Sequence, residues 1–187
     1  MPTRDDRRIG RWVGLLLMAA VGVAVFMSGR GTSDSKEPAG SSIASNRLDE
    51  RRYLDRRREL HRAALDQRWD GVIAGAPELL AWRDDDADVW RWLGMAHQHR
   101  GDFERSAEAW EQAAALPVLR AQSLVRLAAV RQLLGQTDEA LDVLDEAYEL
   151  GYRDVSTLRE IQGLMSLSGD PRFARLIASM EGRDGAP

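Results

Sequence analysis

Two histidines, His97 and His99, are the first side chains of this sequence that could do chemistry, and they lie in the tryptophan-rich stretch VWRWLGMAHQHRGDFERSAEAW, residues 89–110. An imidazole binds transition metals and exchanges a proton near neutral pH. Two ligands on one helix share a face when they are three or four residues apart. His97 and His99 are separated by about 200° around a helix axis. We therefore predict that they form no metal site.

The acidic run DDDAD, residues 84–88, offers the oxygen ligands that calcium prefers, but it lacks the glycine and the distal glutamate of an EF-hand loop. We interpret it as a helix cap, because an aspartate before a helix accepts hydrogen bonds from the first free N–H groups. The chain has no cysteine, and it carries no P-loop, dinucleotide-binding or G-x-S-x-G motif. The sequence predicts no catalytic residue, no metal and no cofactor, and therefore a protein that is not an enzyme.

A period of 34 residues organises the elements around these side chains. Gly101, Gly135 and Gly169 lie 34 residues apart, and each stands between two apolar helical patterns. One further step back reaches Gln67, where the apolar pattern persists without a glycine. Glycine ends a helix readily because it accepts the left-handed conformation. We predict about four units, each made of two helices joined by a tight turn.

The second unit carries the most specific pattern, because Trp90, Leu93 and Gly94 reproduce the sequence W-x2-L-G. It resembles the tetratricopeptide repeat, a helix–turn–helix of 34 residues. The positions that this family fills with tyrosine, small and aromatic residues are held here by His97, Ser106, Trp110 and Ala113. The resemblance covers about residues 53–180, in units of about 53–86, 87–120, 121–154 and 155–180. It implies an all-α fold in which three to four units form a right-handed α-solenoid.

The resemblance also implies a concave groove, lined by the first helix of each unit, that holds an extended peptide or a partner helix. The corresponding positions are Asp88, Arg91, Met95, Gln98 and His99 in the second unit and Gln122, Val125, Ala129, Gln132 and Leu133 in the third. Family members that clamp a carboxylate use lysines and asparagines at places that here hold Arg57, His61, Trp92, Gln122 and Arg126. We predict a protein or peptide partner without that clamp, and we expect Trp82 and Trp92 to be the most exposed tryptophans.

The sequence before the repeats predicts a membrane anchor. Residues 12–28 are uncharged and mostly apolar, and with the flanking residues they approach the length of about 20 residues that a spanning helix needs. Arginines precede this segment, so the positive-inside rule places the repeats outside the cytoplasm. The predicted organisation is a basic cytoplasmic N-terminus at 1–11, a transmembrane signal-anchor at 12–28, a flexible linker at 29–45, the repeat domain at 46–180 and a disordered tail at 181–187.

The net charge of −4 gives no field that would attract nucleic acid. We predict a single-pass protein of a bacterial inner membrane that holds the bilayer through residues 12–28. Its periplasmic domain would be a scaffold for partner proteins in envelope assembly, secretion or cytochrome maturation. Three alternatives stay open: an exported soluble repeat protein after signal cleavage, a small metal-dependent factor on a helical-repeat body, and a passive tether or self-association unit.

Overall fold

The computed structural model describes residues 39–182, and every regular element in that range is helical. The predicted all-α fold class is confirmed for these residues, which contain no strand. The predicted cytoplasmic N-terminus 1–11, the transmembrane segment 12–28, residues 29–38 of the linker and residues 183–187 of the tail lie outside the described residues.

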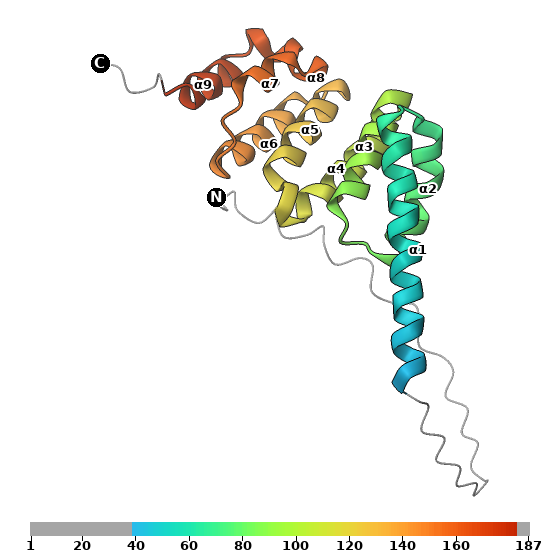
Figure 1. Ribbon diagram of the computed structural model, residues 1–187. Helices are drawn as coiled ribbons and strands as arrows, with labels where there is room; N and C mark the ends of the chain where they lie inside the picture. The colour runs from blue at the N-terminus through green and yellow to red at the C-terminus, as the bar shows by residue number, and fades with distance from the viewer. Residues whose placement is uncertain (1–38, 183–187) are drawn as a thin grey trace, which may run out of the picture. The chain divides into compact units, whose positions relative to one another are not determined.

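The helices follow one another as pairs joined by short turns. The pairs are α1 (Ala39–Leu65) with α2 (Trp69–Trp82), α3 (Ala87–Arg100) with α4 (Phe103–Ala115), and α5 (Arg120–Leu133) with α6 (Thr137–Glu149). A 3-10 turn, η1 (Pro117–Leu119), leads into α5. Consecutive elements pack against one another, and Figure 1 shows the pairs side by side in chain order. This nearest-neighbour packing fits an α-solenoid.

The fourth unit differs from the predicted pair of helices. Its elements are α7 (Val155–Glu160), α8 (Gln162–Met165), η2 (Ser166–Gly169) and α9 (Pro171–Met180). The break falls at Ile161, whose backbone is extended (φ −70°, ψ 117°). A Cβ on Gly163 would lie 2.3 Å from the carbonyl oxygen of Ala129. The break therefore lets the backbone of α8 lie directly on α5, which a side chain at residue 163 would prevent.

The tight turns keep their predicted geometry in two units and change it in two others. Gly101 and Gly135 have φ values of 79° and 76°, as the repeat predicts. Gly169 has no positive φ, and Asp170 caps the next helix instead. Gln67 takes the left-handed conformation (φ 55°) in place of the missing glycine, and no other non-glycine residue between 39 and 182 does so. A left-handed glutamine is strained because its Cβ crowds the backbone.

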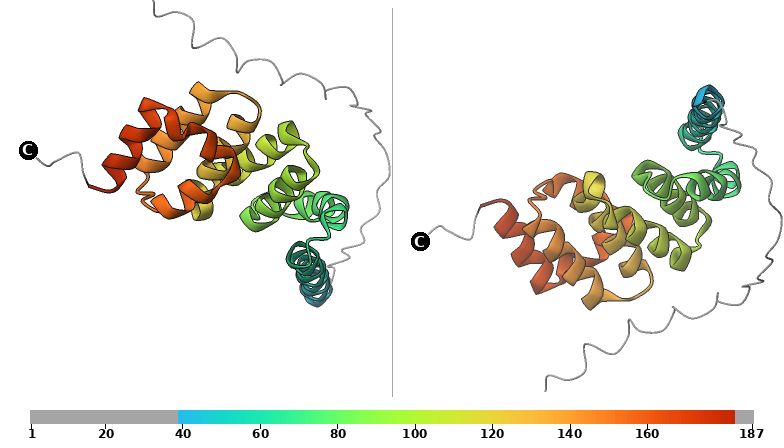
Figure 2. Two further views of the ribbon diagram at one scale, coloured as in Figure 1. Left: turned by 90° about the horizontal axis from the view of Figure 1, so that it is seen from above. Right: turned by 90° about the horizontal axis from the view of Figure 1, so that it is seen from below.

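The first helix is longer than the sequence predicts. α1 begins at Ala39, so residues 39–45 of the predicted linker are helical. The side view in Figure 1 shows the N-terminal part of α1 projecting beyond α2, and both views in Figure 2 place α1 at one end of the row of helices. One flank of α1 therefore has no neighbour within the described range.

Two apolar clusters form the core. One joins α1, α2 and α3 and contains Tyr53, Leu60, Leu79 and Trp92. The other runs from α4 to α9, and among its largest fully buried side chains are Trp110, Leu144, Leu158 and Leu164. α3 contributes to both, because Val89, Trp92 and Ala96 belong to the first cluster while Trp90 and Met95 pack on the second.

Between residues 39 and 182, no single helix is both long and apolar enough to cross a bilayer. The bent pair Phe103–Ala115 and Pro117–Leu133, at 105° to each other, meets the length and composition test only when its two parts are combined.

Exchanging the turn residues of the first and third units tests the strain at Gln67. Gln67→Gly removes the left-handed penalty, so we expect it to raise the free energy of unfolding by about 0.5–1 kcal/mol in urea titrations. The reciprocal change Gly135→Gln places a side chain in the same conformation and should lower it by about 1 kcal/mol. A destabilising Gln67→Gly would show that the glutamine side chain makes a contact worth more than its backbone strain.

Candidate functional site

Asp86 connects α1 to the start of α3. Its carboxylate caps α3 by accepting hydrogen bonds from the backbone N–H groups of Asp88 (3.0 Å) and Val89 (3.2 Å). It also accepts from the Tyr53 hydroxyl (2.5 Å) and from Arg57 Nε (2.5 Å). Arg57 reaches Asp88 through its other nitrogen, at 2.7 Å. The acidic run therefore contains the helix cap that the sequence predicts, at Asp86.

The electrostatics of this junction follow from its burial and its hydrogen bonds. Burial opposes the charge on Asp86, but hydrogen bonds from Arg57 and Tyr53 overcome that effect and lower the pKa of the carboxyl group. The pKa of Tyr53 is raised well above its usual value, first by burial and then by its hydrogen bond to Asp86. Both shifts hold the tyrosine neutral and the aspartate ionised, which suits a structural connection between two helices.

The histidines pack separately against aromatic rings and acids. His61 stacks on Trp92 with ring centroids 4.9 Å apart, and His99 stacks on Trp69 at 4.4 Å. His97 is buried, with Nδ1 3.5 Å from an Asp102 oxygen. Within residues 39–182, no group of three histidine, aspartate or glutamate side chains is placed to hold a metal ion. The stacked rings serve to join α1, α2 and α3.

The expectation that Trp92 is exposed is wrong. Trp92 is only 4% exposed, because His61 covers one part of its ring and Arg57 lies over it with Cζ 5.2 Å from the centroid. Trp82, at the end of α2, is 48% exposed and agrees with the prediction. The difference arises because α1 packs over the start of α3, a contact between helices that are not consecutive.

A cavity of 390 Å³ opens between α3, α5 and the start of α7. Four of the ten predicted groove residues line this cavity. Arg91 and Met95 come from α3, and Gln122 and Val125 come from α5. The remaining lining residues are Trp110, Ser123, Arg126, Tyr152, Asp154 and Thr157.

Several hydrogen-bonding atoms of the lining residues have no partner among the described residues. They are Arg91 Nε, Trp110 Nε1 and Ser123 Oγ, and each is buried. Buried polar atoms are usually paired, since an unpaired one costs about 1–3 kcal/mol. An arginine Nε and an indole nitrogen can only donate, and a serine hydroxyl can do so too. This lining is therefore suited to a ligand that brings hydrogen-bond acceptors.

The side of the cavity formed by the fourth unit is polar and acidic. Asp154 caps α7 and accepts hydrogen bonds from Ser156 and Thr157, which hold the pKa of its carboxyl group at about 2. Burial, and then the neighbouring Asp154, raise the pKa of Tyr152. Arg126 faces this side from α5 and has no ion-pair partner within residues 39–182. The cavity thus combines cationic donors on α3 and α5 with one fixed carboxylate on α7.

The other predicted groove residues lie outside this cavity. Asp88 is paired with Arg57 and Arg91, at 2.7 and 2.8 Å. Gln98 is half-buried, and exposed His99 packs on α2. On α5, Ala129 is fully buried beneath Gly163, Gln132 donates to Ser166 Oγ (3.1 Å), and Leu133 is half-buried.

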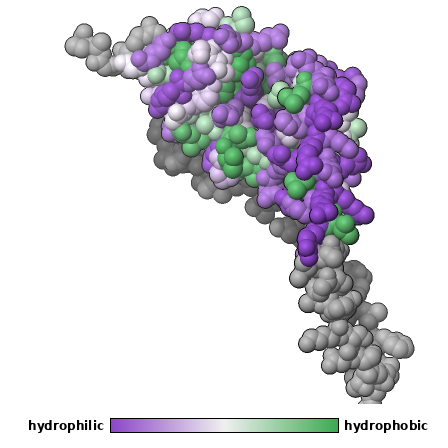
Figure 3. Space-filling model, viewed as in Figure 1, coloured by the Kyte–Doolittle hydropathy of each residue, from purple (hydrophilic) through white to green (hydrophobic). Residues whose placement is uncertain are grey.

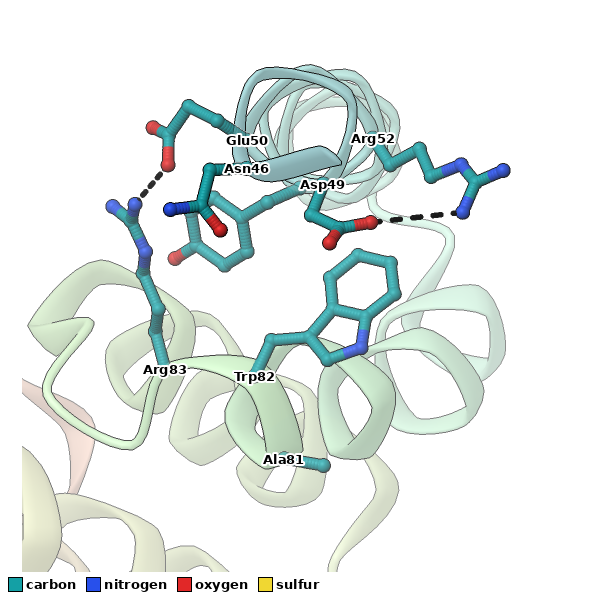
Figure 4. Close-up of a pocket in the computed structure, with 8 residues that line it drawn as sticks. Asn46, Asp49, Glu50, Arg52, Ala81, Trp82 and Arg83 are labelled. Atoms are coloured by element: carbon teal, nitrogen blue, oxygen red, sulfur yellow. Dashed lines mark hydrogen bonds and ion pairs between the residues drawn. The ribbon is translucent and has the colours of Figure 1, made fainter. Parts of the chain in front are cut away.

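A second cavity, of 740 Å³, lies between the N-terminal half of α1 and the end of α2. Figure 4 shows Trp82 beside Asp49 at its edge, with Glu50 and Arg83 paired on one side and Asp49 and Arg52 on the other. The charged groups around it neutralise one another. It therefore offers fewer unpaired groups to a ligand than the cavity between α3, α5 and α7.

The sequence did not predict all the cavity residues. Tyr152, Asp154 and Thr157 belong to the fourth unit, and their place depends on how α7 folds back on α5. Trp110, which holds the aromatic position of the repeat, packs in the core and also lines the cavity.

Residues 87–116 match the family model of the tetratricopeptide repeat. The matched range contains α3 and α4, the second unit and the one whose sequence pattern is most specific. Repeats of this family generally bind other proteins or peptides and are typically non-catalytic. A search of curated proteins finds no match to the chain.

Two buried serines provide a matched test of the unpaired atoms. Ser106 Oγ donates to the Gly94 carbonyl at 2.8 Å, whereas Ser123 Oγ has no partner among residues 39–182. We expect Ser106→Ala to lower the free energy of unfolding by about 1 kcal/mol. Ser123→Ala should be neutral or raise it by up to about 1 kcal/mol, because an unpaired buried hydroxyl is removed. Equal losses in urea titrations of the two variants would contradict the assignment of Ser123 Oγ as unpaired.

Proposed function

We propose that this chain is a non-catalytic docking module that holds an extended segment of a partner protein in the cavity between α3, α5 and α7. The observation that carries the proposal is the row of unpaired donors at Arg91, Trp110 and Ser123 in a cavity lined by helices of successive units. The match of residues 87–116 to a repeat whose usual ligands are proteins and peptides supports it.

The lining defines the chemistry of the ligand. A peptide in extended form presents backbone carbonyl groups, which are acceptors for the indole and hydroxyl donors. A carboxylate suits Arg91 and Arg126, because a guanidinium donates two parallel hydrogen bonds to it. Asp154 disfavours a second acidic group on the α7 side through like-charge repulsion. The preferred ligand is therefore a peptide with one acidic residue beside uncharged neighbours.

The unliganded cavity already holds its donors in place. Arg91 is fixed by Asp88, whose carboxylate accepts from Arg91 Nη2 at 2.8 Å, and Asp88 is itself held by Arg57. Arg91 is the most accessible of the three donor residues, because its side chain is half-exposed whereas Trp110 and Ser123 are buried. A lining fixed in this way reduces the ordering cost of binding.

Selection of random phage-displayed peptides on the full-length protein tests the proposal. Enriched peptides should carry an acidic residue, and Arg91→Ala and Arg126→Ala should each weaken their binding about tenfold, the effect expected for a lost charged hydrogen bond. Arg105→Ala is the matched control, because Arg105 is exposed on α4 and does not line this cavity. Peptides that bind all three variants with the same affinity would contradict the site.

For the segment before the described residues, we propose the arrangement that the sequence predicts. Residues 12–28 anchor the chain in a bacterial inner membrane, and the repeats stand in the periplasm. The apolar run and the arginines that precede it support this proposal. A docking module held at the membrane would bring partners together for envelope assembly, secretion or cytochrome maturation.

Mass spectrometry of the chain from a membrane fraction tests the anchor. We expect an intact N-terminus that retains residues 12–28 and a chain that resists extraction at alkaline pH. A mature N-terminus beyond residue 28, in a soluble fraction, would overturn the anchor in favour of an exported soluble protein.

A further inference from the structure

We propose that the uncovered flank of α1 is a membrane-contact surface that binds anionic lipid headgroups. This inference rests on the proposed anchor, which would hold α1 near the bilayer. The surface is distinct from the cavity between α3, α5 and α7. We call this surface the outer face of α1, and its residues are Leu48, Arg51, Leu54, Asp55, Arg58, Arg62 and Leu65.

The helical geometry puts these residues on one side. At 100° per residue they lie within about 120° of the helix circumference, along about 25 Å of α1. Tyr53, Leu60 and Ala63 occupy the opposite side and are buried against α2 and α3. Apart from Leu54 at its edge, the outer face therefore points away from the fold, in agreement with the position of α1 at one end of the row of helices in Figure 2.

Three leucines are exposed on this face, and Leu54, at its edge, also lines a cavity of 440 Å³ toward the start of α3 and η1. Leu48 is 57% exposed, Leu54 38% and Leu65 70%. In Figure 3 the surface over α1 is mainly hydrophilic, with separate hydrophobic residues between the polar ones. Leucines interleaved with arginines suit the boundary between headgroups and acyl chains, where the apolar side chains insert and the long arginines reach the phosphates.

The charges of the outer face are positive and only partly neutralised. Arg58 pairs with Asp55 at 2.8 Å. Arg51 and Arg62 have no ion-pair partner within residues 39–182, unlike Arg56 and Arg57, which pair with Glu78 and Asp86 of the fold. The protein as a whole has a net charge of −4, so a cationic face on it is a local feature. Charge complementarity therefore favours an anionic surface as its occupant.

The chain outside the structure brings this face close to a bilayer. α1 begins at Ala39, and the proposed anchor ends at residue 28. The connecting residues 29–38 reach at most about 35 Å when fully extended. The start of α1 is therefore confined near the membrane surface, and confinement raises the effective concentration of the helix at the headgroups. Contacts that would be weak in solution then suffice to dock α1.

The absence of cysteine allows a site-specific test on the full-length protein. Leu48→Cys carries a fluorophore on the outer face, and Leu150→Cys carries the same label at a matched control site, since Leu150 is 47% exposed after the end of α6. Both proteins are reconstituted into vesicles of phosphatidylcholine, or of phosphatidylcholine with phosphatidylglycerol, that contain a headgroup-linked quencher.

We expect quenching at residue 48 in phosphatidylglycerol vesicles, little in phosphatidylcholine alone, and none at residue 150. High salt should reduce the quenching, because it screens exposed charges. Arg51→Gln and Arg62→Gln should each shift the equilibrium toward undocked α1 about fivefold. Arg105→Gln, on α4, is the control substitution and should change nothing.

Quenching that is equal at residues 48 and 150, or that is independent of phosphatidylglycerol and of both arginines, would overturn the lipid surface. A different result would favour a second copy of the chain as the occupant. In that case the fluorophore at residue 48 would become less accessible to the quencher as the protein density in phosphatidylcholine vesicles increases. Failure of the proposed anchor would be seen in a different measurement. Without the anchor, the chain would not float with phosphatidylcholine vesicles. Failure of the docking module would appear only in the peptide experiment.

Discussion

The packing of Trp110 against Gly94 is the contact on which the rest of the structure depends. A Cβ at residue 94 would lie 2.8 Å from the indole ring, so the ring fits only where α3 has no side chain. Ser106 of α4 donates a hydrogen bond to the carbonyl oxygen of Gly94 on α3. Loss of a buried tryptophan typically costs about 3–5 kcal/mol, which is a large part of the stability of an ordinary domain. The contact between Gly94 and Trp110 fixes how α3 packs against α4, and α5 of the next unit packs against α4.

The same contact shapes the candidate site. Trp110 also lines the cavity, and its indole nitrogen, which lies against Gly94, has no hydrogen-bond partner among the described residues. Arg91 and Met95 lie on α3 within one helical turn of Gly94. Core packing and ligand chemistry are thus coupled through one helix. The proposed ligand, which brings hydrogen-bond acceptors, would offset the cost of the unpaired donors.

The first unit is joined to the second in a different way. Polar contacts from Tyr53 and Arg57 to Asp86, and the stack of His61 on Trp92, add to the apolar cluster that joins α1, α2 and α3. These contacts use only the inner side of α1. The arginines and leucines of the outer face contribute nothing to the core, which leaves them available for a surface such as the bilayer.

The sequence by itself determined that the fold is helical, the period and the residues that pack between α3 and α4, since these follow from local spacing and from the glycine at the turn. The resemblance to the tetratricopeptide repeat also assigned Arg91, Met95, Gln122 and Val125 to one groove, and these four residues line the cavity between α3, α5 and α7. Contacts between distant helices decided the rest. They buried Trp92 under α1, covered Ala129 with the broken fourth unit, and brought Tyr152 and Asp154 to the cavity. Local periodicity carries no information on such contacts, because they depend on how whole helices stack.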